Sequence, residues 1–510
     1  MTGVASSAPA HANDREPAAM SVHGAAVWAM AGQYLSFALQ FASSVIISRL
    51  FLSPAEVGLF SIALAAALLV AVLQDFGLSR YISGLPSLGP EDIARCSTVA
   101  LLFSFVVAGA IAASAVPMAW AYGHPSLAPI LLIIAATYLV IPFAVVPMAR
   151  MGRAMKFRGH FAVNVGGAIT QAVVAITLAA LGYSSFALAW ATLATGCARS
   201  LIAQIMCPSP PWPLRIDKLR PVIHFGARSS IIYLTGALGT RSPDLIIGKL
   251  LNLMSVGFFS RAVALSDQFR MLVAGAIGSV FYPAFARIRD RGEPLGPAYL
   301  RVCAGYSAII WPGMAGLALS AEPIVRLLYG EAWLPAAPLL SMIALTEVML
   351  ISLPLVNDLP MLLGRLNQLL VLNLIDTALS VVLLAIGCLW GVEGAAASRL
   401  VYGIAWLCLY WRFMHRLVQF DARALMAVYA RSAGAALAAI APLTLTYLFW
   451  APPATIAIPA VFGAIAAGGF AWLAAMFLLR HPTLAEFGEL AASLPIARRL
   501  LPKLKTASWR

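Results

Sequence analysis

The sequence predicts an all-α polytopic membrane protein with about fourteen transmembrane helices, arranged as two six-helix lobes and two additional C-terminal helices. Of the 510 residues, 61% are hydrophobic and only 11% are charged, whereas a soluble protein has roughly a quarter charged residues. Apolar runs recur along the chain, each about 20 residues long and therefore able to cross a ~30 Å hydrocarbon layer. In addition, parts of the first lobe recur in the second.

Polar residues, glycines and prolines divide the chain into the predicted spans. The runs are continuous rather than alternating, which excludes a transmembrane barrel. The first apolar run is too long for a signal-peptide core, so we expect it to remain as a span. In order, the predicted spans are 25–48, 57–80, 97–121, 127–149, 161–181, 184–206, 227–250, 256–286, 298–320, 335–360, 366–390, 393–414, 430–450 and 455–479.

The distribution of positive charge predicts the orientation. With both termini in the cytoplasm, 27 of the 34 lysines and arginines fall in cytoplasmic loops and tails. Three fall in outer loops and four inside predicted spans, which is the positive-inside bias expected of a multi-pass membrane protein. The net charge of +14 is then explained by a cytoplasmic face that meets anionic membrane lipid, and no nucleic-acid partner is expected.

Motifs for cofactor chemistry are missing from the sequence. The six cysteines form no CxxC pair and the seven histidines form no HxxxH or HExxH pair, so we expect neither a metal nor a disulfide framework. No GxxxxGK[ST] motif occurs, so no nucleotide is expected either. We predict no cofactor and a transporter rather than an enzyme.

An internal repeat suggests how the spans are grouped. VGLFSIA at 57–63 is matched by VGFFSRA at 256–262, and YGHPSLAPILLIIA at 122–135 resembles YGEAWLPAAPLLSMIA at 329–344. Lobes with an even number of spans enter the membrane from the same side, as in transporters built from parallel repeats. The predicted organisation is a disordered cytoplasmic tail (1–24), an N-terminal six-helix lobe (25–206), a cytoplasmic inter-lobe linker (207–226), a C-terminal six-helix lobe (227–416), two extra transmembrane helices (430–480) and a basic cytoplasmic tail (481–510).

Several longer phrases resemble a known family. They are SRLFLSPAEVGLFSIA (48–63), QDFGLSRYI (74–82), FYPAFARIRD (281–290), ALSAEPIVRLLYGEAWLPAAPLLSMIAL (318–345) and LGRLNQLLVLN (363–373). Together with the predicted spans, they resemble the Wzx-type oligosaccharide flippases of the multidrug/oligosaccharidyl-lipid/polysaccharide exporter superfamily. The resemblance covers nearly the whole chain after residue 25.

The resemblance implies a function in lipopolysaccharide, exopolysaccharide or capsule biosynthesis. The protein would flip an undecaprenyl-diphosphate-linked oligosaccharide repeat unit from the cytoplasmic to the periplasmic leaflet, by alternating access coupled to a proton or sodium ion. Its implied partners are a polysaccharide polymerase and glycosyltransferases, and we expect a monomer. Two alternatives from the same superfamily are a drug/cation antiporter and a peptidoglycan-precursor flippase. A membrane polysaccharide polymerase or ligase fits less well, because those enzymes need a sizeable periplasmic loop.

Charged residues inside the seventh and eighth predicted spans are candidate site residues. A charge near the bilayer centre costs at least ~2.5–3.5 kcal/mol, so each needs a cavity or a partner. Counted from the outer turn at 251–255, the depths match for Arg241 with Asp267 and for Asp244 with Arg261. This geometry permits two ion pairs across the hairpin, while Arg241 and Asp244, like Asp267 and Arg270, also lie three residues apart on one helix face.

The arginines are predicted to form a cationic, substrate-binding cavity. Arg270 is the leading candidate, since it lies about 21 Å along its helix and a guanidinium binds phosphate oxygens bidentately. Arg399 in the twelfth span is the second candidate, and Arg241 and Arg261 complete the set. Alternatively, these charges neutralise the aspartates and stabilise the lobe, with Arg261 or Arg399 reaching the outer interface.

Acidic residues and one proline complete the predicted site. Glu347 and Asp376 lie near the middle of the tenth and eleventh spans, where they could bind a proton or sodium ion or pair with cavity arginines and hydroxyls. Asp267, Asp244 and Asp75 are candidates for the same ion-coupling or charge-pairing roles, and for Asp75 a salt bridge is favoured. Pro243, which frees the carbonyl of Gly239, marks either a gating hinge or a static kink.

Overall fold

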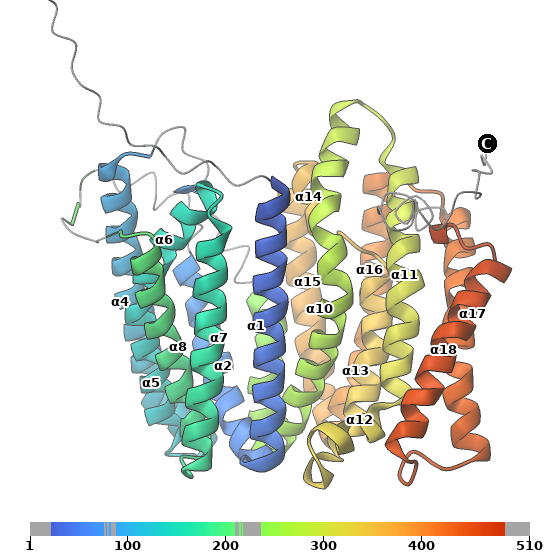
Figure 1. Ribbon diagram of the computed structural model, residues 1–510, viewed down its shortest axis with the longest axis horizontal. Helices are drawn as coiled ribbons and strands as arrows, with labels where there is room; N and C mark the ends of the chain where they lie inside the picture. Colours follow the sequence, from blue (N-terminus) through green and yellow to red (C-terminus); the bar gives the residue numbers. More distant parts are fainter. Residues whose placement is uncertain are drawn as a thin grey trace, which may run out of the picture.

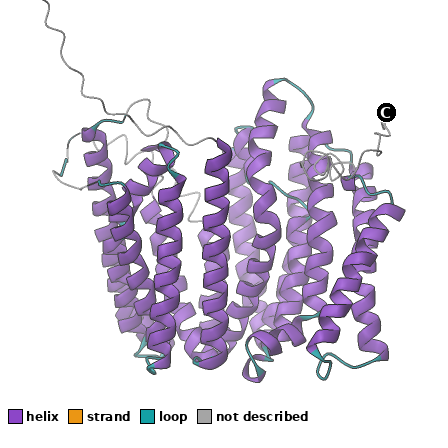
Figure 2. Ribbon diagram, viewed as in Figure 1, coloured by secondary structure: helices purple, strands orange, loops and turns teal. Residues whose placement is uncertain are grey.

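The computed structural model of the chain describes residues 22–75, 78, 81–82, 88–209, 214–215, 217 and 236–484. Figures 1 and 2 show a bundle of helices standing roughly side by side, with short connections at both ends. Within the described residues every regular element is helical, and no strand occurs. The all-α fold class is therefore confirmed, whereas the expected tail 1–24 lies largely outside the described residues.

The N-terminal half contains seven labelled helices. They are α1 (Val22–Leu50), α2 (Pro54–Asp75), α4 (Pro90–Tyr122), α5 (Leu127–Val140), α6 (Pro142–Arg153), α7 (Phe157–Ala180) and α8 (Ser185–Met206). α5 and α6 form one predicted span that bends by 44° at Ile141, directly before Pro142. The bend is expected because a proline has no backbone N–H to donate to the preceding turn.

The C-terminal half begins with helical residues 236–250, and residues 227–235 of the seventh predicted span lie outside the described residues. The labelled elements that follow are α10 (Leu253–Asp290), α11 (Leu295–Leu319), α12 (Ala321–Leu328), η1 (Glu331–Trp333), α13 (Ala336–Ile351), α14 (Asp358–Leu362), α15 (Leu366–Gly387), η2 (Cys388–Trp390), α16 (Gly391–Val418), α17 (Ala422–Phe449) and α18 (Ile458–Leu478). At 38 residues, α10 is about 57 Å long and extends beyond its neighbours (Figure 1).

Each of the fourteen predicted ranges contains described helical residues. By length and composition, nine helices of the described chain could cross a membrane, or ten if the bent pair α5–α6 is one span. One of the nine, Leu366–Val418, includes both α15 and α16, which turn tightly at Gly391 with φ +78°. The chain is thus a multi-pass membrane protein, and the count of fourteen spans stays a prediction.

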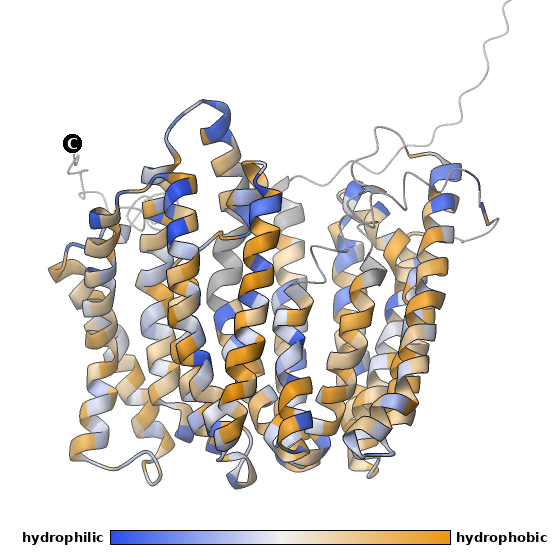
Figure 3. Ribbon diagram, turned by 180° about the vertical axis from the view of Figure 1, so that it is seen from behind, coloured by the Kyte–Doolittle hydropathy of each residue, from blue (hydrophilic) through white to orange (hydrophobic). Residues whose placement is uncertain are grey.

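Side-chain caps explain where several helices begin. Before α2, the Ser53 N–H donates to Glu56 Oε2 at 2.7 Å while the Glu56 N–H donates to Ser53 Oγ at 3.4 Å, which is a capping box. Asn252 accepts from the Ser255 N–H at the start of α10, and Asp421 accepts from the Arg423 N–H at the start of α17. These polar groups fix the turns between apolar runs. Figure 3 shows hydrophobic residues along the helices and hydrophilic ones gathered at the end near the C terminus.

The two halves contact each other at the end of the bundle where α1 ends and α2 begins, the lower end in Figure 1. We call it the joined end. There the Ser61 hydroxyl of α2 donates to the Ser260 hydroxyl of α10 at 3.1 Å. Trp333 Nε1 donates to the Ser48 carbonyl at 2.9 Å, and Arg49 donates to the Leu327 carbonyl.

Further hydrogen bonds connect the halves close by. Lys249 Nζ donates to the Ala121 carbonyl at 2.6 Å, and the Tyr122 hydroxyl donates to the Leu245 carbonyl at 2.9 Å. The halves are therefore held together at the joined end by side chains from α1, α2 and α4 on one side and from residues 245–260, α12 and η1 on the other. The division into two repeated six-helix lobes stays a prediction.

The two C-terminal helices pack on the second half through α11. Ser307 of α11 and Ser432 of α17 share a buried hydrogen bond of 2.8 Å, and Ser432 is 2.9 Å from His481 Nε2, just after α18. Trp472 Nε1 of α18 donates to the Ala308 carbonyl at 2.9 Å. α17 and α18 are both among the helices that could cross a membrane.

Candidate functional site

A cavity of about 840 Å³ lies between the two halves. Its walls come from α1, α2, α7 and α8 on one side, and from residues 236–250, α10, α13, α15 and α16 on the other. Ten of the eleven residues singled out in the sequence line it: Gly239, Arg241, Pro243, Asp244, Arg261, Asp267, Arg270, Glu347, Asp376 and Arg399. The eleventh, Asp75, is the last residue of α2, and its side chain lies outside the described part of the structure.

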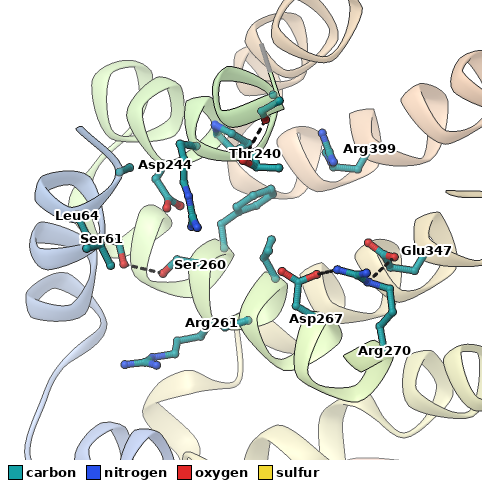
Figure 4. Close-up of a pocket in the computed structure, with 18 of the residues that line it drawn as sticks. Ser61, Leu64, Thr240, Asp244, Ser260, Arg261, Asp267, Arg270, Glu347 and Arg399 are labelled. Atoms are coloured by element: carbon teal, nitrogen blue, oxygen red, sulfur yellow. Dashed lines mark hydrogen bonds and ion pairs between the residues drawn. The ribbon is translucent and has the colours of Figure 1, made fainter. Parts of the chain in front are cut away.

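Arg270 is held between two carboxylates (Figure 4). Its Nη2 is 2.8 Å from Asp267 Oδ1, three residues earlier on α10, and its Nε is 3.2 Å from Glu347 Oε2 on α13. The Nε–H nevertheless has no hydrogen bond of acceptable geometry. The leading candidate for phosphate binding therefore already has two anionic partners, with 34% of its side chain exposed.

Arg261 lies on the same helix but extends in another direction (Figure 4). Its Nη1 donates to Ser44 Oγ of α1 at 2.6 Å, and its Nε is buried without a hydrogen-bond partner. This contact crosses from the second half to the first near the joined end. Among the described residues, the Asp244–Arg261 ion pair that the matching depths permit is therefore not formed.

Arg241 and Asp244 lie on the neighbouring helix. Neither makes an ion pair within 4 Å among the described residues, and Arg241 is exposed to the cavity. The permitted Arg241–Asp267 pair is not formed either, because Asp267 pairs with Arg270, three residues away on the same helix face, which is the other pairing that the sequence allowed. Matching depth along a hairpin is not sufficient for pairing, since the rotation of each helix about its axis decides where a side chain points.

Arg399 belongs to a second polar group, on α15 and α16. Its Nη1 donates to Ser380 Oγ at 2.9 Å, and its guanidinium lies 4.6 Å from the centre of the Tyr402 ring, in cation–π geometry. The Tyr402 hydroxyl donates to Asp376 Oδ1 at 2.9 Å. A second hydrogen bond joins the same two helices: the hydroxyl of Tyr410, two turns after Tyr402 on α16, donates at 2.8 Å to Oδ1 of Asn373, one turn before Asp376 on α15.

Among the described residues, four arginines and four carboxylates line the cavity, and they differ in whether they have a partner of opposite charge. Arg270 pairs with both Asp267 and Glu347, so that one cation serves two carboxylates, and Asp376 accepts a hydrogen bond from a tyrosine hydroxyl. Arg241, Arg261 and Arg399 have no carboxylate within 4 Å among the described residues. A guanidinium without an anionic partner is the group that a phosphate or carboxylate ligand can bind.

Pro243 and Gly239 lie within helical residues 236–250, and the helix is continuous through both. Pro243 is buried, and a Cβ at position 239 would lie 3.5 Å from Thr377 Oγ1 of α15. The helix therefore packs closely on α15 at this point. A hinge at Pro243 stays a prediction.

Several cavity residues were not anticipated. Tyr402 and Tyr410 lie in an apolar run, where an aromatic residue ordinarily packs in the core. Only the fold shows that their hydroxyls donate hydrogen bonds to Asp376 and Asn373. A second cavity, of about 510 Å³, contains Arg199. In the sequence analysis Arg199 is counted among the residues of a cytoplasmic loop, whereas in the structure it lies inside α8.

Comparisons with known proteins agree with this architecture. A family model described as "Polysaccharide biosynthesis protein" matches residues 46–338. The succinoglycan biosynthesis transport protein ExoT of Rhizobium meliloti (strain 1021) is 24% identical over 324 residues, which are 63% of this chain and 65% of that protein. The lipopolysaccharide biosynthesis protein WzxC of Escherichia coli (strain K12) is 20% identical over 332 residues, or 64% of this chain and 66% of that one. The chain thus spans just under two thirds of these two relatives.

Among solved structures, the lipid II flippase MurJ in an inward closed conformation is similar with a TM-score of 0.70. The identity is 14%, and the match covers 89% of this chain and 99% of that one. At this identity the likeness concerns the fold alone.

Proposed function

Because the chain belongs to the polysaccharide biosynthesis protein family, we propose that it transports a lipid-linked oligosaccharide repeat unit across the bacterial inner membrane, from the cytoplasmic to the periplasmic leaflet. The observation that carries this proposal is the cavity between the halves, in which three arginines have no carboxylate partner within the part of the chain that the structure describes. Such a cavity suits an anionic head group such as a diphosphate.

The size of the cavity limits what it can enclose. A volume of about 840 Å³ is within the range of ligand pockets for small molecules, roughly 300–1,000 Å³. It accommodates a diphosphate and its first sugars, but not an undecaprenyl chain, which must stay in the lipid. Only the polar part of the cargo would then cross through the protein.

Arg241 and Arg399 are the best placed to bind the diphosphate. They lie on different helices, both line the cavity, and neither must first leave a carboxylate. Arg270 becomes available only when Asp267 and Glu347 release it. We propose that uptake of a proton or sodium ion at Glu347 or Asp376 changes these contacts and couples transport to an ion gradient.

Alternating access requires the joined end to open. In the present arrangement, hydrogen bonds such as Ser61–Ser260 and Trp333–Ser48 hold the halves together on that side. If the termini are cytoplasmic, this is the periplasmic side. Cargo would enter from the opposite side and leave after the joined end separates.

A drug/cation antiporter of the same superfamily is the second candidate. The observation in its favour is Asp244, which lines the cavity without an ion-pair partner among the described residues. A cationic drug would bind there, whereas an anionic cargo would bind the arginines. The competing ligands therefore select different residues.

Reconstitution into liposomes tests the proposal. A fluorescent undecaprenyl-diphosphate-linked oligosaccharide is placed in one leaflet, and its appearance in the other is measured by quenching. We expect transport by the wild type, loss of at least about tenfold in Arg241→Ala or Arg399→Ala since each removes a charged hydrogen-bonding group, and retention in Asp244→Asn. Transport that survives both arginine changes but fails in Asp244→Asn would favour the antiporter.

A further inference from the structure

The second cavity lies wholly within residues 22–206 and we call it the side chamber. α1, α5, α6, α7 and α8 form its walls, and its volume is about 510 Å³. Gln40 of α1 and Gln171 of α7 line both the side chamber and the central cavity. The two spaces therefore adjoin at these two amides, for which the described residues provide no hydrogen-bond partner.

Arg199 is the only charged residue among those that line the side chamber in the described chain. It has no ion pair and donates no hydrogen bond to any described residue, and its Nε is buried without a partner. It lies fourteen residues after Ser185, about 21 Å along α8, so it is well inside a helix that could cross the membrane. A charge at such a depth costs at least ~2.5–3.5 kcal/mol unless it is compensated.

No carboxylate on the surrounding helices can compensate it. The sequence has no aspartate or glutamate between Asp92 and Asp217, which covers α5 to α8 completely, and α1 has none either. The neighbouring hydroxyls of Thr192, Thr195 and Ser200 donate to the carbonyls of Leu188, Ala191 and Val140, and although such hydroxyls can accept from a guanidinium, they carry no charge. The counter-charge must therefore come from outside these five helices.

The Arg199 side chain packs against the backbone of α7 at Gly167. A Cβ at Gly167 of α7 would lie 2.6 Å from Arg199 Nε and 2.7 Å from its Cγ, so the arginine occupies the space that a side chain at 167 would need. Asn164, one turn earlier on α7, also lines the side chamber. A fixed guanidinium with an amide nearby binds an anion at a lower entropic cost than a mobile one.

We propose that the side chamber is an oxyanion-binding site, in which Arg199 compensates the charge of a phosphate group and the Asn164 amide donates a further hydrogen bond. The phosphate is either free or part of a lipid-linked cargo that reaches the chamber past Gln40 and Gln171. Only the second source rests on the proposed function. The site is separate from Arg241, Arg261, Arg270 and Arg399, which line the central cavity alone.

Binding to the purified full-length protein in detergent tests this site. The probes are inorganic phosphate and farnesyl diphosphate, and the readouts are the dissociation constant and the thermal unfolding midpoint. We expect Arg199→Gln to weaken binding of at least one probe by about tenfold or more, since a hydrogen bond to a charged group contributes ~1.5–3 kcal/mol. Arg199→Lys should retain part of the binding, because the charge stays while the fork is lost.

Two further variants separate geometry from net charge. Gly167→Ala leaves every charge in place but displaces the arginine, so it should also weaken binding. Arg301→Gln removes an equivalent charge from the exposed start of α11 and should bind like the wild type. Arg199→Gln should remain folded without ligand, because it removes an uncompensated charge, and its unfolding midpoint should no longer respond to the probe.

The outcomes are distinct. Arg199-dependent binding of inorganic phosphate supports a free anion, and Arg199-dependent binding of farnesyl diphosphate alone supports the cargo as the source. If neither probe binds the wild type more tightly than Arg199→Gln, or if Arg301→Gln has the same effect, the site is refuted. The Arg241→Gln/Arg399→Gln variant should lose transport yet keep Arg199-dependent phosphate binding, so failure of the transport proposal would be recognised separately.

Discussion

Gly58 of α2 and Gly257 of α10 make reciprocal backbone contacts: a Cβ at Gly58 would overlap the Leu253 carbonyl oxygen, and a Cβ at Gly257 would overlap the Pro54 carbonyl oxygen. The two glycines are 199 residues apart in the sequence. The same separation relates Pro54 to Leu253, whose carbonyl oxygens they contact, and Ser61 to Ser260, which are hydrogen-bonded to each other. Reciprocal contacts of this kind are what a two-fold axis produces. The contact brings α2 and α10 together at the joined end without intervening side chains.

Cross-linking at this contact should block transport. The Ser61 and Ser260 hydroxyl oxygens are 3.1 Å apart, so Ser61→Cys/Ser260→Cys places two sulfurs within reach of a disulfide. We expect oxidation to abolish liposome transport and reduction to restore it. Each single cysteine variant serves as the control, and full transport by the oxidised, fully cross-linked protein would contradict a requirement for opening here.

A larger side chain at Gly257 should separate the joined end. Gly257→Leu cannot keep the present distance between α10 and Pro54, so the halves must move apart. In a Ser61→Cys/Ser260→Cys background we expect the yield of disulfide to fall several-fold, because the two helices no longer meet. Gly463→Leu on α18, where a Cβ would meet nothing within 4 Å, is a matched control that should leave the yield unchanged.

Variants of the ion-paired cluster of Arg270, Asp267 and Glu347 can separate an effect on stability from an effect on transport. Arg270→Ala leaves Asp267 and Glu347 facing each other without a cation, so we expect the free energy of unfolding to fall by roughly 2–3 kcal/mol. Arg270→Gln/Glu347→Gln removes one charge of each sign and should regain most of that stability. Thermal unfolding in detergent measures both.

If Arg270 also binds cargo, the double variant should still fail to transport, and Arg270→Lys should retain part of the activity. Normal transport by Arg270→Ala would show that the residue has no role in binding.

Two tyrosines on α16 allow a matched comparison of ion coupling. Tyr402→Phe removes the hydroxyl that donates to Asp376, whereas Tyr410→Phe removes the one that donates to Asn373. Asp376 can take up a proton and Asn373 cannot, so Tyr402→Phe should shift the pH or sodium dependence of transport, and Tyr410→Phe, whose hydroxyl also lies within reach of Asp376, should shift it less. An equal shift in both variants would point to packing of the two rings, which lie 4.7 Å apart.

Acid should loosen the attachment of the last two helices through His481. Burial and the nearby charge of Arg431 lower the pKa of His481 to about 4, from an ordinary value of 6.5. The imidazole is therefore neutral in the folded protein, and stability present above pH 6.5 is lost as the pH falls toward 4, by up to about 3 kcal/mol. The unfolding midpoint measured from pH 7 to pH 4.5 should fall less steeply in His481→Gln than in the wild type.

Much of the site was accessible from the sequence, because charges inside apolar runs are rare and expensive. Ten of eleven chosen residues line one cavity. Part of their pairing was accessible as well, because Asp267 and Arg270 lie three residues apart on one helix face and a cavity arginine was one expected partner of Glu347. That Glu347 of α13 meets Arg270 in particular depends on the rotation of α10 and α13 about their axes, which no periodicity in a uniformly apolar helix reports. Arg199 was missed for a related reason, as a basic residue seven positions before the end of α8 is counted with the loop.

The absence of carboxylates from α1 and α5 to α8 has a consequence for how energy enters the protein. Together these five helices carry positive charge and no acidic side chain, so they cannot bind a proton or a cation at a carboxylate, whatever the gradient across the membrane. By contrast, α10, α13 and α15 bring Asp267, Glu347 and Asp376 to the central cavity. The two sides of the central cavity are thus electrically unequal: among the described residues, every carboxylate that lines it comes from residues 236–250, α10, α13 or α15.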